Sequence, residues 1–169
     1  MCKPILLIGM MGCGKSTIGR LLAGRMGLPL IDLDEEIARA AGRSIPEIFA
    51  EEGDAGFRLH ETAALGRALN AGEAVIATGG GIVTREENIR MMREKGVVVW
   101  LCRPLEDMIA GVRQDTRPNL AGDKEERMRT LYAQRAHLYE AAAHLQFDNR
   151  MPPREAAKML EKLLTERKK

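Results

Sequence analysis

Short apolar runs recur along this chain and alternate with stretches that have helical spacing. Five of these runs are candidate strands: residues 5–8, 28–32, 74–78, 97–101 and 145–148. Amphipathic segments such as 57–69 and 109–112 lie between them. Because strands that alternate with helices build a parallel sheet covered on both faces, the pattern predicts a single α/β domain over residues 1–169, with a five-stranded parallel sheet flanked by helices.

A glycine-rich loop follows the first apolar run directly. Residues 9–17 read GMMGCGKST and lead into helical spacing at Ile18 and Leu21, so a complete GxxxxGKS phosphate-binding loop lies between a strand and a helix. In such a loop the glycines let backbone N–H groups close around phosphates, Lys15 reaches the β- and γ-phosphate oxygens, and the Ser16 hydroxyl ligates Mg²⁺. The positive end of the helix adds to this site. The loop therefore predicts that the chain binds a nucleoside triphosphate.

Carboxylates follow the second candidate strand, and ligands of open parallel sheets bind at the carboxyl ends of the strands. Asp32 and Asp34 are two residues apart at an extended end, where strand alternation would aim both side chains the same way. One carboxylate would then serve the metal and the other the acceptor hydroxyl. The alternative is that Asp34 caps the helix that follows.

The third candidate strand ends in Gly79, Gly80 and Gly81, more glycines than a single tight turn needs. Their bare backbone can present N–H groups to a hydroxyl or a carboxylate pressed close to the chain. A flexible loop is the alternative.

Two arginines bear on the charge of the acceptor. Arg58 and Glu61 are three residues apart on a helix predicted from about residue 54 to residue 69, so Glu61 could hold the guanidinium while its fork faces a ligand. An ordinary surface pair is the alternative. Arg135 raises the same question, and two arginines converging on one site would favour an acceptor with a carboxylate or a phosphate.

The charged stretch 113–129, which contains Pro118 and Gly122, interrupts the alternation of strands and helices. We expect a mobile lid here, since lids recur in enzymes that must keep water away from phosphoryl transfer. The alternative is a solvated surface loop that leads into a helix.

Composition narrows the class of acceptor. The 26 Lys and Arg residues nearly balance the 24 Asp and Glu residues, so no broad basic face indicates nucleic acid or an anionic membrane, and a small-molecule substrate is expected. Cys2, Cys13 and Cys102 lack metal-ligand spacing, and their odd number is unlike a secreted disulfide framework, which favours a reducing cytoplasm. The N-terminal apolar stretch of about five residues is too short for a signal segment or a membrane span.

Together, the order and spacing of these motifs resemble the shikimate kinase family along nearly the whole chain. The matching segments are GMMGCGKSTIGRLLA from residue 9, IDLDEEI from residue 31, GFRLHE around Arg58, ATGGGIV at 77–83, TRP at 116–118 and LYAQRAHLY at 131–139. The resemblance implies a nucleoside-monophosphate-kinase-like P-loop fold. It also implies an enzyme that uses ATP and Mg²⁺ to phosphorylate the 3-hydroxyl of shikimate in aromatic amino-acid biosynthesis.

The resemblance also implies residue roles. The ATP-binding loop would consist of Gly12, Cys13, Gly14, Lys15, Ser16 and Thr17. Ser16 would bind Mg²⁺, Asp32 would reach the metal through water, and Arg117 would enter from the lid as a catalytic cation beside Lys15.

On the acceptor side, Asp34 would be the third catalytic residue and would hold the reacting hydroxyl, as an orienting group first and a base second. Arg58 and Arg135 would bind the shikimate carboxylate. The ring hydroxyls would meet Gly79, Gly80 and Gly81, and the pocket would be lined by Phe49, Phe57 and Glu61.

The chain departs from the family pattern around the adenine site. A base-stacking arginine is expected several residues before the lid arginine, but Ala110 and Gly111 occupy that neighbourhood. Residues 150–153 are candidates for the opposite wall of the site. The lid also reads Arg117, Pro118, Asn119, where the family often has leucine after the proline, and this bears on lid packing.

Two rival functions stay open on the residues alone. Another kinase of this fold, for gluconate or a nucleoside monophosphate, would share the phosphate-binding loop but has no evident need for the glycine run together with Arg58 and Arg135. A non-catalytic nucleotide-binding module would have little reason to keep Asp34 and Arg117. The favoured reading is a monomer that acts on shikimate, with neither nucleic acid nor membrane as a partner.

Overall fold

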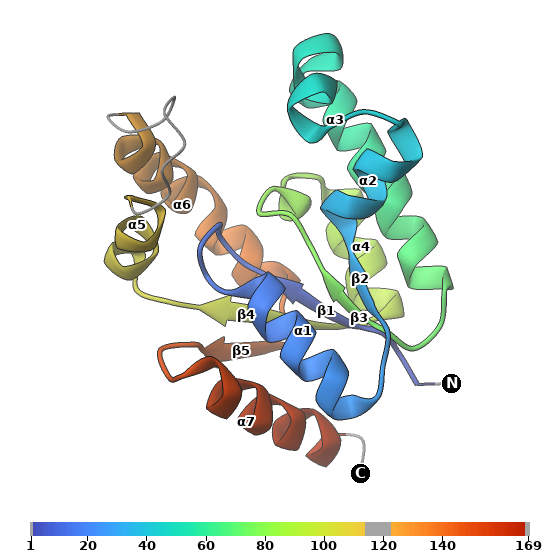
Figure 1. Ribbon diagram of the computed structural model, residues 1–169, viewed down its shortest axis with the longest axis vertical. Helices are drawn as coiled ribbons and strands as arrows, with labels where there is room; N and C mark the ends of the chain where they lie inside the picture. The colour runs from blue at the N-terminus through green and yellow to red at the C-terminus, as the bar shows by residue number, and fades with distance from the viewer. Residues whose placement is uncertain (1, 114–122, 168–169) are drawn as a thin grey trace.

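A five-stranded sheet with every strand parallel forms the centre of the protein, whose computed structural model describes residues 2–113 and 123–167 (Figure 1). The strands are β1 (Ile5–Ile8), β2 (Leu30–Asp32), β3 (Val75–Ala77), β4 (Val97–Cys102) and β5 (Leu145–Asp148). Their order is β2-β3-β1-β4-β5, so β1 lies in the middle and all four of its residues are buried. The predicted fold class is confirmed.

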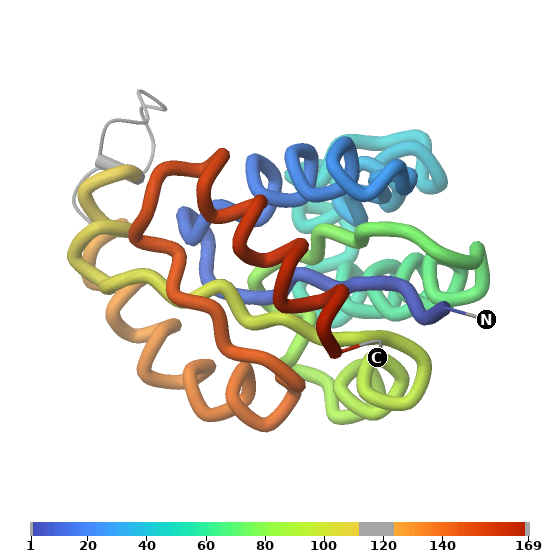
Figure 2. The backbone as a smooth tube through the Cα atoms, turned by 90° about the horizontal axis from the view of Figure 1, so that it is seen from below, coloured from blue at the N-terminus to red at the C-terminus, as the bar shows by residue number. Residues whose placement is uncertain are grey.

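Helices cover both faces of the sheet. They are α1 (Lys15–Met26), α2 (Leu33–Ala41), α3 (Ile45–Asn70), the 3₁₀ turn η1 (Ile82–Thr84), α4 (Glu86–Lys95), α5 (Leu105–Arg113), α6 (Asp123–Ala142) and α7 (Pro153–Glu166). Helices α1 and α7 pack together on one face, and α4 and α6 pack together on the other (Figure 2). Helices α2 and α3 pack against each other at the β2 side of the sheet.

The observed strand boundaries differ slightly from the predicted ones. Strand β2 begins at Leu30 rather than residue 28, because the Leu28 N–H donates to the Ala23 carbonyl at the end of α1 and Pro29 has no N–H to offer a neighbouring strand. Strand β4 extends to Cys102, which pairs with Asp148 of β5.

Helix α3 has two arms that meet at Gly53. The first arm starts with a capping box in which the Ser44 hydroxyl accepts from the Glu47 N–H (3.3 Å) and the Glu47 carboxylate accepts from the Ser44 N–H (2.8 Å). Gly53 then breaks the helical geometry with φ 69° and ψ −173°. The helix predicted from about residue 54 is the second arm, and the first arm was not predicted.

The segment predicted as a lid overlaps two helices. Residue 113 is the last of α5, and residues 123–129 form the first turns of α6. Arg129 pairs with Glu125 at 2.9 Å on the same helix and with Glu106 of α5 at 2.7 Å, which ties the start of α6 to α5. Residues 114–122, and with them Arg117, lie outside the described residues, so the movement of a lid stays a prediction.

Candidate active site

The phosphate-binding loop connects β1 to α1, as predicted. All three of its glycines have backbone angles that favour glycine, with φ 144° at Gly9, 81° at Gly12 and 100° at Gly14, and Gly14 caps α1. The Lys15 Nζ donates to the carbonyls of Gly9 (2.7 Å) and Met10 (2.9 Å), so the ammonium lies within the curve of the loop. Ser16 and Thr17 are exposed in the first turn of α1, where a phosphate or a metal can reach their hydroxyls.

Two features of the loop were not predicted from the sequence. The Asn149 side-chain amide, which is buried, donates to the Cys13 carbonyl at 2.7 Å and so ties the loop to the end of β5. The Cys13 side chain is itself fully buried, with Sγ 3.6 Å from the Lys15 Nζ. Asn149, which follows β5 late in the chain, therefore helps to fix the conformation of the loop.

Asp32 and Asp34 have different positions from those expected. Strand β2 ends at Asp32, whose Oδ1 accepts from the N–H groups of Asp34 (3.0 Å) and Glu35 (3.3 Å), so Asp32 is the N-cap of α2. The suggestion that Asp34 is the cap is wrong, because Asp34 lies in the first turn of the helix. Strand alternation does not relate the two side chains either, since α2 begins at Leu33.

The Asp34 side chain is exposed and opens onto a cavity, although neighbouring protein atoms remove part of the water around its carboxylate. This desolvation raises the pKa of Asp34 above its ordinary value of 3.8, and the neighbouring Asp32 carboxylate raises it further. The charges of Lys15 and Arg58 oppose that rise. A raised pKa strengthens Asp34 as a proton acceptor, which an orienting role alone does not require.

The three glycines after β3 lie against charged side chains. A Cβ on Gly79 would be 3.0 Å from the Glu61 Oε2 and 3.3 Å from the Asp34 Oδ1, and a Cβ on Gly81 would be 2.2 Å from the Arg58 Nη1. The φ angles of all three lie outside the left-handed region, so at Gly79 and Gly81 the reason for glycine is space rather than backbone freedom, whereas a Cβ on Gly80 would come no closer than 3.6 Å to another atom. The buried Tyr139 hydroxyl donates to the Gly80 carbonyl at 2.6 Å and fixes the turn, a contact that was not predicted.

Arg58 is held in place by carboxylates from its own helix. Its Nη1 donates to the Glu61 Oε1 at 2.9 Å, and its Nη2 donates to the Asp54 Oδ1 at 3.3 Å. The guanidinium also lies 5.3 Å from the centre of the Phe57 ring, which stacks on Phe49 with ring centres 4.4 Å apart. Glu61 is 1% exposed, so this ion pair is not the ordinary surface pair considered as the alternative.

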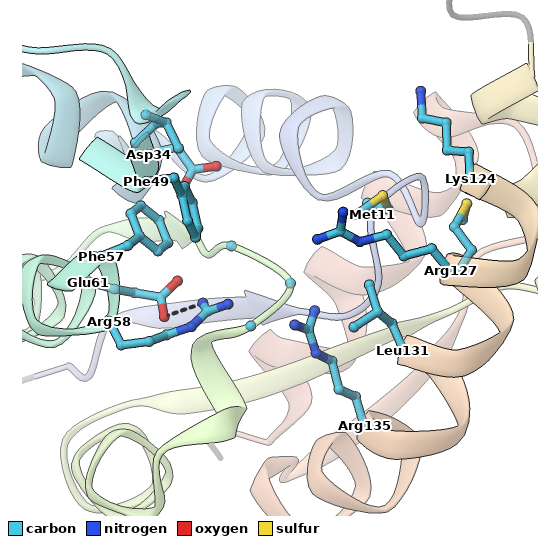
Figure 3. A pocket seen from close by; sticks show the side chains of 15 residues that line it. Met11, Asp34, Phe49, Phe57, Arg58, Glu61, Lys124, Arg127, Leu131 and Arg135 are labelled. Atoms are coloured by element: carbon cyan, nitrogen blue, oxygen red, sulfur yellow. Dashed lines mark hydrogen bonds and ion pairs between the residues drawn. The ribbon is translucent and has the colours of Figure 1, made fainter. Parts of the chain in front are cut away.

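A cavity of about 330 Å³ brings most of the predicted acceptor site together (Figure 3). Its lining includes all six residues proposed to bind the acceptor: Asp34, Arg58, Gly79, Gly80, Gly81 and Arg135. Phe49, Phe57 and Glu61 also line it, as expected. The lining residues that sequence reasoning missed are Met11, Ile45, Lys124, Arg127, Met128 and Leu131. A spacing of four residues from Arg127 through Leu131 to Arg135 was the signal that could have revealed part of this set.

The comparisons with known proteins agree with this geometry. Residues 11–165 match the sequence profile of the family described as shikimate kinase. This chain belongs to the shikimate kinase family. Shikimate kinase activity follows from that membership, and the resemblance inferred from the sequence is confirmed.

Individual shikimate kinases match most of the chain. The enzyme of Symbiobacterium thermophilum is 43% identical over 165 residues, which cover 94% of this chain and 95% of that relative. The enzyme of Ruegeria pomeroyi is 45% identical over 142 residues, which cover 83% of this chain and 73% of that relative. A solved structure of the shikimate kinase from Acinetobacter baumannii in complex with shikimate has a TM-score of 0.92 at 36% identity and covers 99% of this chain and 96% of that one.

A shikimate kinase uses ATP, and residues 150–153 were predicted to form one wall of its adenine site. The Arg150 guanidinium is exposed and bonds the Asp148 carboxylate, with Nε 2.9 Å from both carboxylate oxygens. Arg103, at the end of β4, donates to the Gly12 carbonyl at 3.4 Å, and its Nε is buried without a hydrogen-bond partner among the described residues. A wall for adenine at residues 150–153 stays a prediction.

The oxygen donors near the loop suit Mg²⁺. Within residues 2–113 and 123–167, no three His, Cys, Asp or Glu side chains gather closely enough to hold a metal by themselves. Ser16 offers a hydroxyl and Asp32 a carboxylate oxygen beyond the one used in capping α2. This set is chemically appropriate because Mg²⁺ prefers oxygen ligands and usually keeps several waters and substrate phosphates in its coordination sphere.

No helix of the described chain is long and apolar enough to cross a membrane.

Proposed function

We propose that the described cavity binds shikimate and that the phosphate-binding loop holds ATP beside it, so that the γ-phosphoryl group passes to the 3-hydroxyl of shikimate. The observation that carries this proposal is the joint lining of one cavity by Asp34, Arg58, Arg135 and the loop residue Met11. Acceptor groups and nucleotide loop therefore face the same space (Figure 3). The cavity, about 330 Å³, is of a size that small ligands occupy.

In this proposal the two arginines orient the substrate through its carboxylate. Glu61 and Asp54 fix the Arg58 guanidinium before the ligand arrives, which lowers the entropy lost on binding. Arg135 approaches the glycine turn from α6, with its Nη1 3.6 Å from the point a Cβ on Gly80 would occupy. The bare backbone of Gly79–Gly81 then leaves room for the ring hydroxyls.

Phosphoryl transfer requires alignment and neutralisation of charge, because its transition state is loose and spreads negative charge over the γ-phosphate oxygens. We assign that neutralisation to Lys15 and to Arg117. Ser16 and Asp32 would hold Mg²⁺, which supplies further positive charge at the phosphates when bound. Asp34 orients the 3-hydroxyl and accepts its proton late, a role that its raised pKa supports.

We further infer that the chain acts as a single domain and as a monomer in the cytoplasm. All the residues proposed to bind the acceptor line one cavity within the chain. The cysteines Cys2, Cys13 and Cys102 are all free thiols, in keeping with a reducing compartment.

A coupled assay of ADP release tests the proposed function. Wild-type protein with ATP and Mg²⁺ is offered shikimate, gluconate, a nucleoside monophosphate or no acceptor. We expect turnover with shikimate alone, and Asp34→Asn should lower kcat by more than ~100-fold while shikimate still binds. Turnover with a different acceptor, or ADP release without any acceptor, would contradict the proposal.

A further inference from the structure

The substrate cavity carries more positive charge than shikimate requires. Among its described lining residues there are four cations, Arg58, Lys124, Arg127 and Arg135, and two carboxylates, Asp34 and Glu61. Shikimate brings one carboxylate, whereas its phosphorylated product adds a phosphate monoester with a charge of about −1.5 to −2 at neutral pH. The surplus of cations therefore matches the second anionic group of the product.

Two of these cations are already placed at the glycine turn. The Arg58 guanidinium lies against Gly81, where a Cβ would be only 2.2 Å from Nη1, and it pairs with Glu61. Arg135 meets the same turn at Gly80. Both side chains are therefore positioned to bind a carboxylate in the part of the cavity next to the glycine turn.

Arg127 lies farther along α6 than these two. Arg127, Leu131 and Arg135 recur every four residues and share one helix face, and a rise of 1.5 Å per residue places Arg127 about 12 Å from Arg135 along the axis. Figure 3 shows the Arg127 side chain reaching from α6 into the cavity beside Met11 of the phosphate-binding loop. The guanidinium is therefore on the side of the cavity where the phosphoryl group arrives.

Arg127 also differs from Arg129, two residues further along α6, in its ion pairs within the described chain. Arg129 is bound by Glu106 and Glu125, but no ion pair or hydrogen bond of Arg127 occurs within the described chain. An arginine that lines a cavity without a carboxylate partner keeps its fork of donors for a ligand, and that fork matches phosphate oxygens.

We propose that Arg127 binds the phosphate of shikimate 3-phosphate, so that it contacts the transferred group at the end of the reaction and strengthens the hold on product relative to substrate. This inference rests on the proposed function. Shikimate has no phosphate at that position, so the contact contributes to product affinity and not to substrate affinity.

Calorimetry of the full chain tests this role by measuring Kd for shikimate and for shikimate 3-phosphate separately. We expect Arg127→Gln to weaken binding of shikimate 3-phosphate by ~10- to 100-fold, the worth of a charge-assisted hydrogen bond, and to leave shikimate affinity within ~2-fold. Arg127→Lys should keep part of the product affinity, because it retains the charge but not the fork. The control is Arg67→Gln, which removes an exposed arginine of α3 outside this cavity and should change neither Kd.

Two results would overturn the role of Arg127. If Arg127→Gln raised the Kd of both ligands equally, the arginine would act on the carboxylate or through the electrostatic potential of the whole cavity. If the Kd of shikimate 3-phosphate did not change, Arg127 would make no contact with the phosphate. Unchanged shikimate affinity in the variant also demonstrates that it is folded. If the wild type bound neither ligand, the proposed function itself would fail and this inference with it.

Discussion

Space, rather than backbone conformation, dictates the residue at position 81. The φ of Gly81 is −94°, which any residue can adopt, but a Cβ there would lie 2.2 Å from Nη1 and 2.5 Å from Cζ of Arg58. The glycine therefore keeps room for a guanidinium that Glu61 and Asp54 hold in place. In the proposed function, its contribution is to substrate binding more than to stability.

Gly81→Ala is expected to displace the Arg58 guanidinium and weaken shikimate binding by ~10-fold or more, the usual loss for a hydrogen bond between charged groups. The melting temperature should change little, because the displaced group is the end of a flexible side chain. Calorimetry and thermal unfolding measure the two effects. Gly66→Ala is the control, since nothing lies within 4 Å of its Cβ. Unchanged affinity in Gly81→Ala would refute the spatial argument.

Glu61 links the site to the pH dependence of stability. It is 1% exposed, and its Oε2 has no hydrogen-bond partner among the described residues. Desolvation raises the pKa of Glu61 above its ordinary value of 4.5; Asp34 adds to this rise, while Arg58 and Arg135 oppose it. The folded protein therefore keeps this proton to a higher pH than the unfolded chain does.

Because the unfolded chain loses this proton first, the free energy of unfolding falls as the pH rises from the unfolded pKa to the folded one. Glu61→Gln has no carboxyl group at this position, so its free energy of unfolding does not fall in this way. The difference in free energy of unfolding between the variant and the wild type should therefore shift in favour of the variant as the pH rises above ~4.5, and level off once Glu61 of the folded wild type is ionised. Urea denaturation of both proteins between about pH 4.5 and pH 7.5 measures the difference. A difference that stays constant across this range would show that Glu61 has an ordinary pKa.

At the scale of elements, the kink in α3 shapes one wall of the cavity. The first arm contributes Ile45 and Phe49 to the lining, and the second arm contributes Phe57, Arg58 and Glu61. Gly53 separates the arms with φ 69°, and no atom lies within 4 Å of its Cβ position. Here the backbone angle, and not space, requires glycine.

Gly53→Ala should therefore destabilise the protein by ~1–3 kcal/mol, the cost of a non-glycine residue in such a conformation. We also expect a higher KM for shikimate, because a straighter α3 moves Phe49 away from Phe57. Urea denaturation and steady-state kinetics measure the two effects. Gly24→Ala, in α1 with open space around it, is the control and should leave KM unchanged. Equal stability of Gly53→Ala and the wild type would show that the kink carries no strain.

The sequence predicts elements well where one physical signal dominates. All five strands were located to within two residues, because buried parallel strands are continuous apolar runs between helices. The first arm of α3 was missed although Ser44, Pro46 and Glu47 form a helix-start signature. Asp32 was misassigned relative to Asp34, because two acidic residues near a strand end are equally plausible caps and only the end of β2 decides between them.

The residues of the candidate site also divide into those that the sequence identified and those that it missed. Residues inside motifs, such as Lys15, Arg58 and Arg135, could be named in advance. The contacts of Asn149 and Tyr139 could not, although Tyr139 ends the quoted segment 131–139, because each residue acts through a single contact with a backbone carbonyl far away in sequence. Lys124 and Arg127 were predicted only as part of the lid at 113–129, and the path of α6 brings them to the cavity.

At the scale of the whole molecule, the sheet order explains why the two halves of the site meet. Strand β1 pairs with β3, so the phosphate-binding loop and the glycine turn leave neighbouring strands at the same edge of the sheet. The Thr78 hydroxyl, directly after β3, donates a hydrogen bond to the Leu7 carbonyl of β1 (2.9 Å) and so joins the carboxyl ends of the two strands. In the proposed function, strand pairing thereby sets the distance between nucleotide and acceptor, and sites supported by strands are held more precisely than sites on loops.

We expect the chain to unfold as one cooperative unit, as a single domain should. Trp100 is the only tryptophan of the sequence, lies in β4 and is near Tyr139 of α6, with ring centres 5.8 Å apart. Its fluorescence therefore reports on packing at the sheet, while far-UV circular dichroism reports on the helices. The two urea transitions should share one midpoint. Separate midpoints would divide the chain into independently stable parts.

The central position of β1 also governs when a newly made chain can become active. Its partners follow 70 residues later at Val75 and 92 residues later at Val97, as the pairs Ile5↔Val75 and Ile5↔Val97 show. At a synthesis rate of about 5–20 residues per second, the ribosome needs several seconds or more to deliver both neighbours. The nucleotide loop is thus translated before the strands that support it. In a nascent chain, the strand pairs on both sides of β1 can form only after Val97 has been made.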